Sequence, residues 1–171
     1  MTGASEAARP LLSFLLKYGY VALFLIFILE GAMLLYIAPS ESLVPIAVAS
    51  PLATSLPEYA LVIAVAVAGA TIGQLALFLV AKRGGRPAIQ HHHWLRITEA
   101  RLDRYEGWFT RWGPLVIPVS NTLLFIRGML TIPAGLAKME TRRFVVLSAI
   151  GTFIFESTLA ALTLGVIGLR I

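Results

Sequence analysis

The chain has 171 residues, of which 58% are hydrophobic and 13% charged, and 14 Lys and Arg against 9 Asp and Glu give a net charge of +5. Soluble domains are about a quarter charged. This composition, with a mean hydropathy of +0.83, argues against a water-soluble enzyme and, despite the positive charge, against a nucleic-acid-binding protein. No cysteine is present, so disulfides, thiolate nucleophiles and Cys-based metal sites are excluded.

Three apolar segments are long enough to cross a bilayer, which takes about 20 residues. They are Leu11–Ala38, Tyr59–Ala81 and Phe144–Leu169. The second has no charge, whereas the first contains Glu30 and the third Glu156. The apolar run after Arg9 lacks a small-residue cleavage site, so we expect the first segment to stay as a helix rather than act as a secretory signal.

Two further apolar segments, Ala38–Pro57 and Gly113–Ala137, contain four and three prolines. Proline removes a backbone donor and breaks a helix. Broken helices at membrane depth are tolerated where protein or a water-filled cavity surrounds them. The sequence therefore predicts an all-α integral membrane protein with transmembrane helices and two proline-broken re-entrant hairpins.

The order of these segments predicts a single membrane domain, 1–171, built as an inverted repeat. The half-repeats cover about residues 10–83 and 113–169, and a linker of about 84–112 joins them. Between Lys82 and Trp112 there are seven basic and three acidic residues, which favours a cytoplasmic location for 82–112. Apolar residues recur at helical spacing within this linker. They fit a helix in the membrane interface or one packed on the bundle.

Four ionisable residues lie within the apolar segments: Glu30, Glu41, Arg127 and Glu156. A charge at the centre of a membrane helix costs roughly 2.5–3.5 kcal/mol, so these residues indicate a functional site. Glu30 is 13 residues beyond Lys17, which places it about 20 Å deeper along a helix. Facing hairpins would bring Arg127 towards both Glu30 and Glu41.

Such a group suits the binding of an anion together with protons. A guanidinium binds phosphate or carboxylate through a bidentate fork, and carboxylates in a partly dry site take up protons more readily than in water. The expected substrate-binding and proton-coupling residues are Pro39, Ser40, Asn121 and Gly128 beside Glu30, Glu41 and Arg127, with Glu156 as a proton relay. The alternative is a buried ion pair that only fixes the hairpins.

The order of four motifs resembles the DedA family, also called the VTT or SNARE-associated Golgi protein domain, over about Gly19–Gly165. They are EGAMLLYIAPSE at 30–41, GATIGQ at 69–74, KRGGR at 82–86, and Arg127 followed by AGLAKM at 134–139 with Phe144 and Gly151 after it. The resemblance implies transport of polyprenyl phosphate by proton-coupled flipping, or lipid scrambling without a gradient. It maps the two family acids to Glu30 and Glu41 and the second of its two arginines to Arg127.

Three positions depart from the family pattern. The first arginine is replaced by Asn121, the proline usually found between the two arginines is replaced by Leu124, and Gln74 stands where the family often has an acid. We expect membrane lipids, polyprenyl phosphate in particular, and protons as partners, and no nucleic acid; a homo-oligomer is compatible with the sequence. A proton-coupled ion or small-solute transporter is the alternative function.

No cofactor, metal site or catalytic residue is expected. Three consecutive histidines at 91–93 cannot all face one ion from a regular helix, and no histidine lies inside an apolar segment to serve an intramembrane serine protease or a lipid phosphatase. The only aspartate, Asp103, lies in the linker, which excludes an aspartyl protease. The sequence thus predicts a multi-pass protein of a prokaryotic plasma membrane that is not an enzyme.

Overall fold

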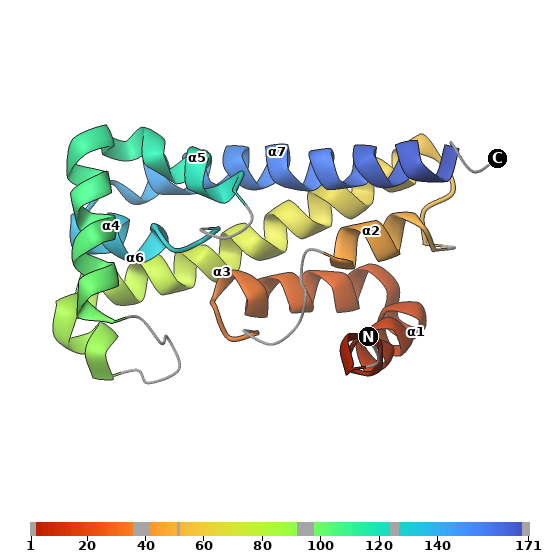
Figure 1. Cartoon of the computed structure of the whole chain (residues 1–171), viewed down its shortest axis with the longest axis horizontal. Helices are drawn as coiled ribbons and strands as arrows, with labels where there is room; N and C mark the ends of the chain where they lie inside the picture. Colours follow the sequence, from red (N-terminus) through yellow and green to blue (C-terminus); the bar gives the residue numbers. More distant parts are fainter. Residues whose placement is uncertain (1–2, 36–41, 51, 92–97, 124–126, 169–171) are drawn as a thin grey trace.

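The computed structural model describes residues 3–35, 42–50, 52–91, 98–123 and 127–168, and in this part of the chain every regular element is a helix (Figure 1). The elements are α1 (Gly3–Gly31), α2 (Leu43–Val48), α3 (Leu56–His91), α4 (Glu99–Trp112), the 3-10 turn η3 (Gly113–Leu115), α5 (Val116–Asn121), α6 (Thr131–Leu136) and α7 (Thr141–Gly168). The all-α prediction is confirmed, whereas the re-entrant hairpins, the inverted repeat and the half-repeat boundaries stay predictions.

The long apolar helices α3 and α7 run side by side in opposite directions (Figure 1). By length and composition, Leu56–Pro87 and Thr141–Val166 are each able to cross a membrane. Both correspond to segments that the sequence predicts as spans. The helix α3 continues to His91, beyond the end of the predicted span, and bends at Gly85, whose φ is +65°.

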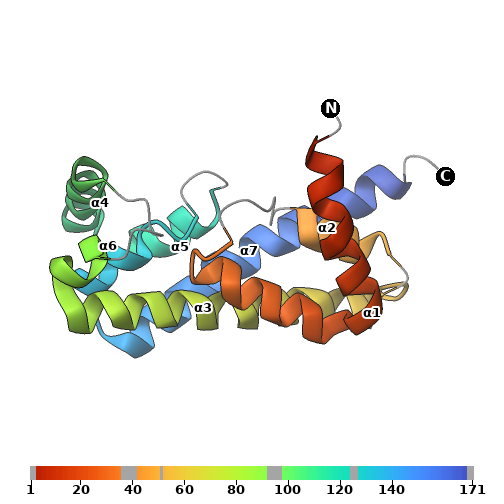
Figure 2. The same ribbon diagram turned by 90° about the horizontal axis from the view of Figure 1, so that it is seen from below.

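The first predicted span, Leu11–Ala38, is a bent helix that stops short of the predicted end. Gly19 has φ +58° and ψ −132° inside α1, so the helix bends there, and it ends at Gly31. The part before the bend points away from α3 (Figure 2). Glycine adopts positive φ without the steric cost that a side chain adds, which explains why the bend falls at this residue although the hydropathy continues through it.

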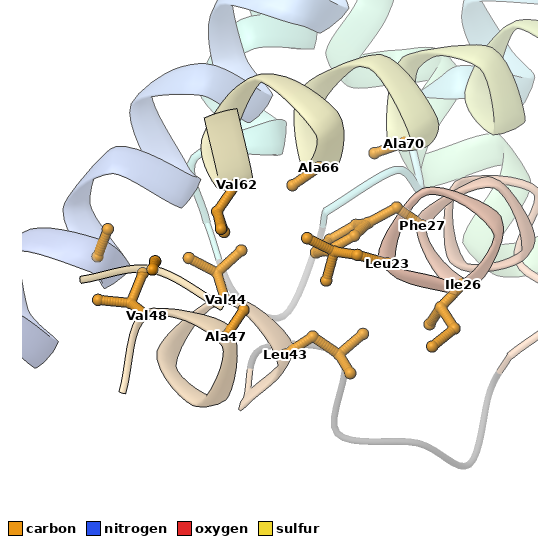
Figure 3. Packing of buried hydrophobic residues seen from close by; sticks show 12 residues of the cluster. Leu23, Ile26, Phe27, Leu43, Val44, Ala47, Val48, Val62, Ala66 and Ala70 are labelled. Carbon is orange, nitrogen blue, oxygen red and sulfur yellow. The ribbon is translucent and has the colours of Figure 1, made fainter. Parts of the chain in front are cut away.

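The second part of α1 packs on α3 through glycines. A Cβ atom added at Gly31 would overlap the carbonyl oxygen of Ala70, and one added at Gly73 would overlap that of Ile28. Small residues allow membrane helices to approach this closely. Next to this crossing, buried side chains from α1, α2 and α3 form an apolar cluster, shown in Figure 3.

The start of α3 is capped by Glu58. Its Oε2 accepts hydrogen bonds from the backbone N–H of Thr54 at 2.6 Å and of Ser55 at 2.9 Å. A glutamate three residues after the N-cap satisfies backbone donors that the helix leaves open. Glu58, the charged residue just before the predicted span, thus caps the start of the helix.

Each proline-containing segment folds into short helices. The helices α2, α5 and α6 have six residues each, with Pro45, Pro118 and Pro133 as their third residues. The first N–H groups of a helix have no intrahelical partner, so proline is tolerated there. Within the first segment, residues 38–41 and 51 lie outside the described residues.

The predicted linker helix is confirmed as α4, which lies across one end of the bundle (Figure 1). The guanidinium of Arg86, near the end of α3, contacts Asp103 at 2.8 Å and Glu106 at 2.5 Å. The Tyr105 hydroxyl donates to Sδ of Met129 at 2.9 Å. These contacts join α4 to the bundle. Its location in the membrane interface stays a prediction.

Candidate functional site

The site is centred on Arg127, which begins the turn before α6. Its Nη2 lies 2.5 Å from Oε1 of Glu156, and its Nη1 lies 3.4 Å from Oε1 of Glu30. Glu30 comes from the end of α1 and Glu156 from the middle of α7. The structure therefore joins three segments that are far apart in sequence through one guanidinium.

All three charged side chains of this ion triad (Glu30, Arg127 and Glu156) are removed from the surface. The exposed fractions are 13% for Glu30, 6% for Arg127 and 1% for Glu156. A buried charge without a partner is very costly, whereas a well-placed opposite charge recovers much of that cost. Because there is one positive group against two negative ones, the triad carries a net charge of −1 when both acids are ionised and is neutral when one of them is protonated.

The guanidinium also packs against an aromatic ring. The Cζ atom of Arg127 lies 4.5 Å from the ring centroid of Phe155, which precedes Glu156 in α7. A cation over a ring face is attracted to it, and more strongly where water is excluded. Phe155 thus limits the orientations of the guanidinium. The Nε of Arg127 makes no hydrogen bond within the described part of the chain.

A second polar cluster lies beside the triad and has no formal charge. Asn121 Nδ2 donates to Oε1 of Gln74 at 3.1 Å and to Oγ of Ser148 at 3.2 Å, and the Ser148 hydroxyl also donates to Gln74. All three side chains are buried. We call this group the amide cluster. It connects α3, α5 and α7 in the middle of the bundle.

The amide cluster holds the turn that carries Arg127. The backbone N–H of Gly128 donates to Oδ1 of Asn121 at 3.1 Å. Gly128 has φ +73°, a conformation that favours glycine. Asn121 thus acts on the residue next to the guanidinium, and both residues contribute to the orientation of Arg127.

The predicted site residues therefore fall into two groups. Glu30, Asn121, Arg127, Gly128 and Glu156 are brought together. Pro39, Ser40 and Glu41 lie outside the described residues. Among the residues with described positions, no group of three His, Cys, Asp or Glu is placed to hold a metal ion.

Sequence reasoning missed Phe155 and Ser148. Nothing in an apolar run distinguishes one phenylalanine from its neighbours. For Ser148 a signal does exist, because Ser148, Thr152 and Glu156 are spaced by four residues in an otherwise apolar helix. Residues at this spacing share one helix face, so they mark the side of α7 that faces the site.

Known proteins similar to this chain include both characterised and uncharacterised membrane proteins. The uncharacterized membrane protein YbfM of Bacillus subtilis (strain 168) is 30% identical over 139 residues, 81% of this chain and 84% of the relative. Undecaprenyl phosphate transporter A of Staphylococcus aureus (strain NCTC 8325 / PS 47) is 30% identical over 148 residues, 84% of this chain and 71% of the relative. The protein of the same name from Bacillus subtilis (strain 168) is 33% identical over 85 residues, 49% of this chain and 43% of the relative.

No solved structure matches the chain. The model of the VTT domain matches residues 38–164, which include the whole of α3, the amide cluster, Arg127 and Glu156. Because this match covers most of the chain, and relatives align over more than two thirds of it, the protein belongs to the VTT domain family of membrane proteins, as the DedA-like motifs predict.

Proposed function

We propose that the chain transports an anionic lipid, polyprenyl phosphate in particular, across a bacterial plasma membrane and that proton binding is coupled to each crossing. The observation that carries this proposal is the buried guanidinium of Arg127, which two carboxylates from different helices share. Two relatives named undecaprenyl phosphate transporter A support the substrate class. In this proposal Arg127 binds the phosphate of the headgroup.

The charge of the triad explains why protons are needed. With both acids ionised, a phosphate approaching Arg127 meets a site of net charge −1 and must compete with Glu30 and Glu156 for the guanidinium. Protonation of one acid removes this net charge, and protonation of the second leaves Arg127 with no anionic partner in the triad. Phosphate binding and proton binding therefore favour each other, as linked equilibria must.

The exchange of partners requires little movement of Arg127. Its Nη1 contact with Glu30 is long, at 3.4 Å, and the amide cluster holds the neighbouring residue. We propose that Glu30 releases the guanidinium first and that Glu156 remains as its anchor. Pro39, Ser40 and Glu41 are proposed to complete the headgroup site, in accordance with the family pattern. The basic linker, 82–112, is proposed to lie on the cytoplasmic side.

The test is transport by the full chain reconstituted in liposomes with headgroup-labelled polyprenyl phosphate, in which lipid that reaches the far leaflet is detected by an impermeant reagent. We expect transport that slows when an ionophore collapses the pH gradient. Arg127→Ala should abolish transport, Arg127→Lys should retain part of it because the planar fork is lost, and Arg143→Ala, an exposed arginine of α7, should transport normally.

Four outcomes would contradict the proposal in part or altogether. Full transport by Arg127→Ala would exclude this residue as the headgroup ligand. Transport that is unchanged by the ionophore would identify a scramblase. Movement of an ion or a small solute without movement of lipid would favour the proton-coupled solute transporter instead. An enzymatic product formed from the labelled lipid would contradict a transport function altogether.

A further inference from the structure

A groove of about 590 Å³ lies along the contact of α3 and α7. Ligand sites commonly have volumes of roughly 300–1,000 Å³. Because both walls belong to helices able to cross a membrane, we expect the groove to open towards the hydrocarbon of the bilayer. The lining residues are all uncharged and mostly apolar: Ala60, Ile63, Ala64, Val67, Ala68, Thr71, Ile72, Ala149, Phe153 and Ser157.

Three hydroxyl groups lie in this lining or next to it along the helices. Thr71 is 7% exposed, and its hydroxyl has no hydrogen-bond partner within the described part of the chain. The hydroxyls of Ser157 and Thr152 also have no hydrogen-bond partner there. Thr152 is fully buried. Thr71 and Ser157 also line the groove. We call these three residues the hydroxyl seam.

Other hydroxyls of α7 behave differently. Thr158 Oγ1 donates to the carbonyl oxygen of Ile154 at 2.7 Å, and Thr163 Oγ1 donates to that of Leu159 at 2.8 Å. This bond to the preceding turn is the usual way in which a helix satisfies such a group. Thr152 makes no such bond, and its buried hydroxyl has no hydrogen-bond partner within the described part of the chain.

The residues of the hydroxyl seam lie within one helical turn of the ion triad or of the amide cluster along their helices. Ser157 follows Glu156 directly, and Thr152 precedes Glu156 by one helical turn on the same face. Thr71 lies one turn before Gln74, which belongs to the amide cluster. The seam therefore provides neutral donors between an apolar surface and a buried cation.

We propose that the groove binds the hydrocarbon chain of an anionic lipid, in the part next to the headgroup, and that the hydroxyl seam receives the headgroup as it passes between α3 and α7 to Arg127. This inference rests on the proposed function and names the entrance to the same site. In this inference the apolar groove suits the hydrocarbon chain of the lipid. The neutral hydroxyl donors and then the guanidinium suit its phosphate.

The first test is photo-crosslinking in nanodiscs with a polyprenyl phosphate that carries a diazirine in the isoprene unit nearest the phosphate. We expect adducts at Ile72 and Phe153, and a loss of about tenfold when unlabelled polyprenyl phosphate competes. The uncharged polyprenol should not compete. Adducts spread evenly to exposed residues of α1 such as Val21 and Leu25, or equal competition by the polyprenol, would overturn the inference.

The second test fills the groove. Ala68→Phe adds a ring to its wall, whereas Ala76→Phe adds the same ring two turns further along α3, at an exposed position outside the groove. We expect transport to fall about tenfold in the first variant and to stay within about twofold of wild type in the second. Equal rates in the two variants would overturn the inference.

The third test removes hydroxyls without changing shape. Thr152→Val should slow transport several-fold while the protein remains monodisperse, and Thr163→Val should not slow it. Normal transport by Thr152→Val would exclude the hydroxyl seam from the path. The proposed function would survive each of these negative results, because it is tested separately, by lipid transport of the wild-type protein, by the effect of the ionophore and by Arg127→Ala.

Discussion

Asn121 donates a hydrogen bond from Nδ2 to Oε1 of Gln74 at 3.1 Å, linking the end of α5 to the middle of α3. Both positions depart from the DedA-like motifs: the resemblance implies an arginine at Asn121 and, often, an acid at Gln74. The two departures meet in space as a neutral amide pair. Since both side chains are buried, neither position can become charged alone without a large penalty.

This relationship predicts a strong interaction between two substitutions. Gln74→Glu and Asn121→Arg should each lower the free energy of unfolding by about 3–5 kcal/mol, because each leaves a buried charge unpaired. The double variant should recover at least about 1 kcal/mol of the summed loss. The measurement is thermal or denaturant unfolding of the purified protein in detergent. Losses that simply add would show that the two positions are independent.

The two acids of the triad should respond differently to neutralisation. Glu156→Gln removes a charge-assisted hydrogen bond of 2.5 Å from a side chain that is 1% exposed, and we expect a loss of about 1.5–3 kcal/mol in the free energy of unfolding. Glu30→Gln weakens a contact of 3.4 Å and should cost less. Denaturant unfolding of both variants in detergent measures the difference, and a larger loss in Glu30→Gln would reverse the assignment of Glu156 as the anchor.

Transport as a function of pH separates the proton roles of these acids. We expect the Glu30→Gln variant to lose most of its pH dependence, since Glu30 is the acid proposed to release Arg127. The exposed Glu140, between α6 and α7, provides the control, and Glu140→Gln should leave both stability and the pH profile unchanged. A wild-type pH profile in Glu30→Gln would assign the proton to another group.

The turn after Arg127 should be sensitive to a single methyl group. In Gly128→Ala there is room for the added Cβ, whose nearest neighbour would be Gln74 Nε2 at 3.8 Å, but the φ of +73° remains unfavourable. We expect a loss of about 1–2 kcal/mol in the free energy of unfolding. Gly107→Ala, in open space on α4, should instead stabilise by about 0.5–1 kcal/mol. Equal effects in the two variants would show that the turn relaxes freely.

The crossing of α1 and α3 should not tolerate a larger residue. Gly73→Ala forces the added methyl group against the carbonyl oxygen of Ile28, so the helices must separate, and we expect a loss of about 1–3 kcal/mol or more. Gly165→Ala lies in open space on α7 and should be neutral or stabilising. The midpoint of thermal unfolding in detergent distinguishes the two. A neutral Gly73→Ala would mean that α1 is not held tightly against α3.

Hydropathy predicts those parts of the fold that depend on local composition. The helices α3 and α7 follow from long, mostly uncharged runs, and α4 follows from the spacing of Leu102 and Tyr105 in a polar segment. The bend of α1 at Gly19 does not follow, because a glycine within a helical pattern is compatible with both a straight and a bent helix. Its φ depends on how the segment packs, which the sequence does not display.

The site could be predicted only as a set of residues. A charge in an apolar segment needs a partner, and that argument selects Glu30, Glu41, Arg127 and Glu156 from hydropathy and charge alone. Of these, Glu41 lies outside the described residues. Hydropathy and charge do not say which acid lies closer, and Glu156, expected as a relay, has the shorter contact with Arg127. Partners such as Gln74 and Asn121, which are 47 residues apart in sequence, are determined by the tertiary packing of three helices.

Two cations near the end of α3, Lys82 and Arg86, use their positive charge in contacts within the protein. Lys82 Nζ donates to the carbonyl oxygen of Met139 at 2.7 Å and to Thr141 Oγ1 at 3.2 Å, so it ties the start of α7 to α3. Arg86 is neutralised by two acids of α4. Among the described residues, the exposed guanidinium groups near this end of the bundle include those of Arg83, Arg101, Arg104, Arg111, Arg142 and Arg143. Salt in the surrounding solution should weaken their attraction to acidic phospholipids.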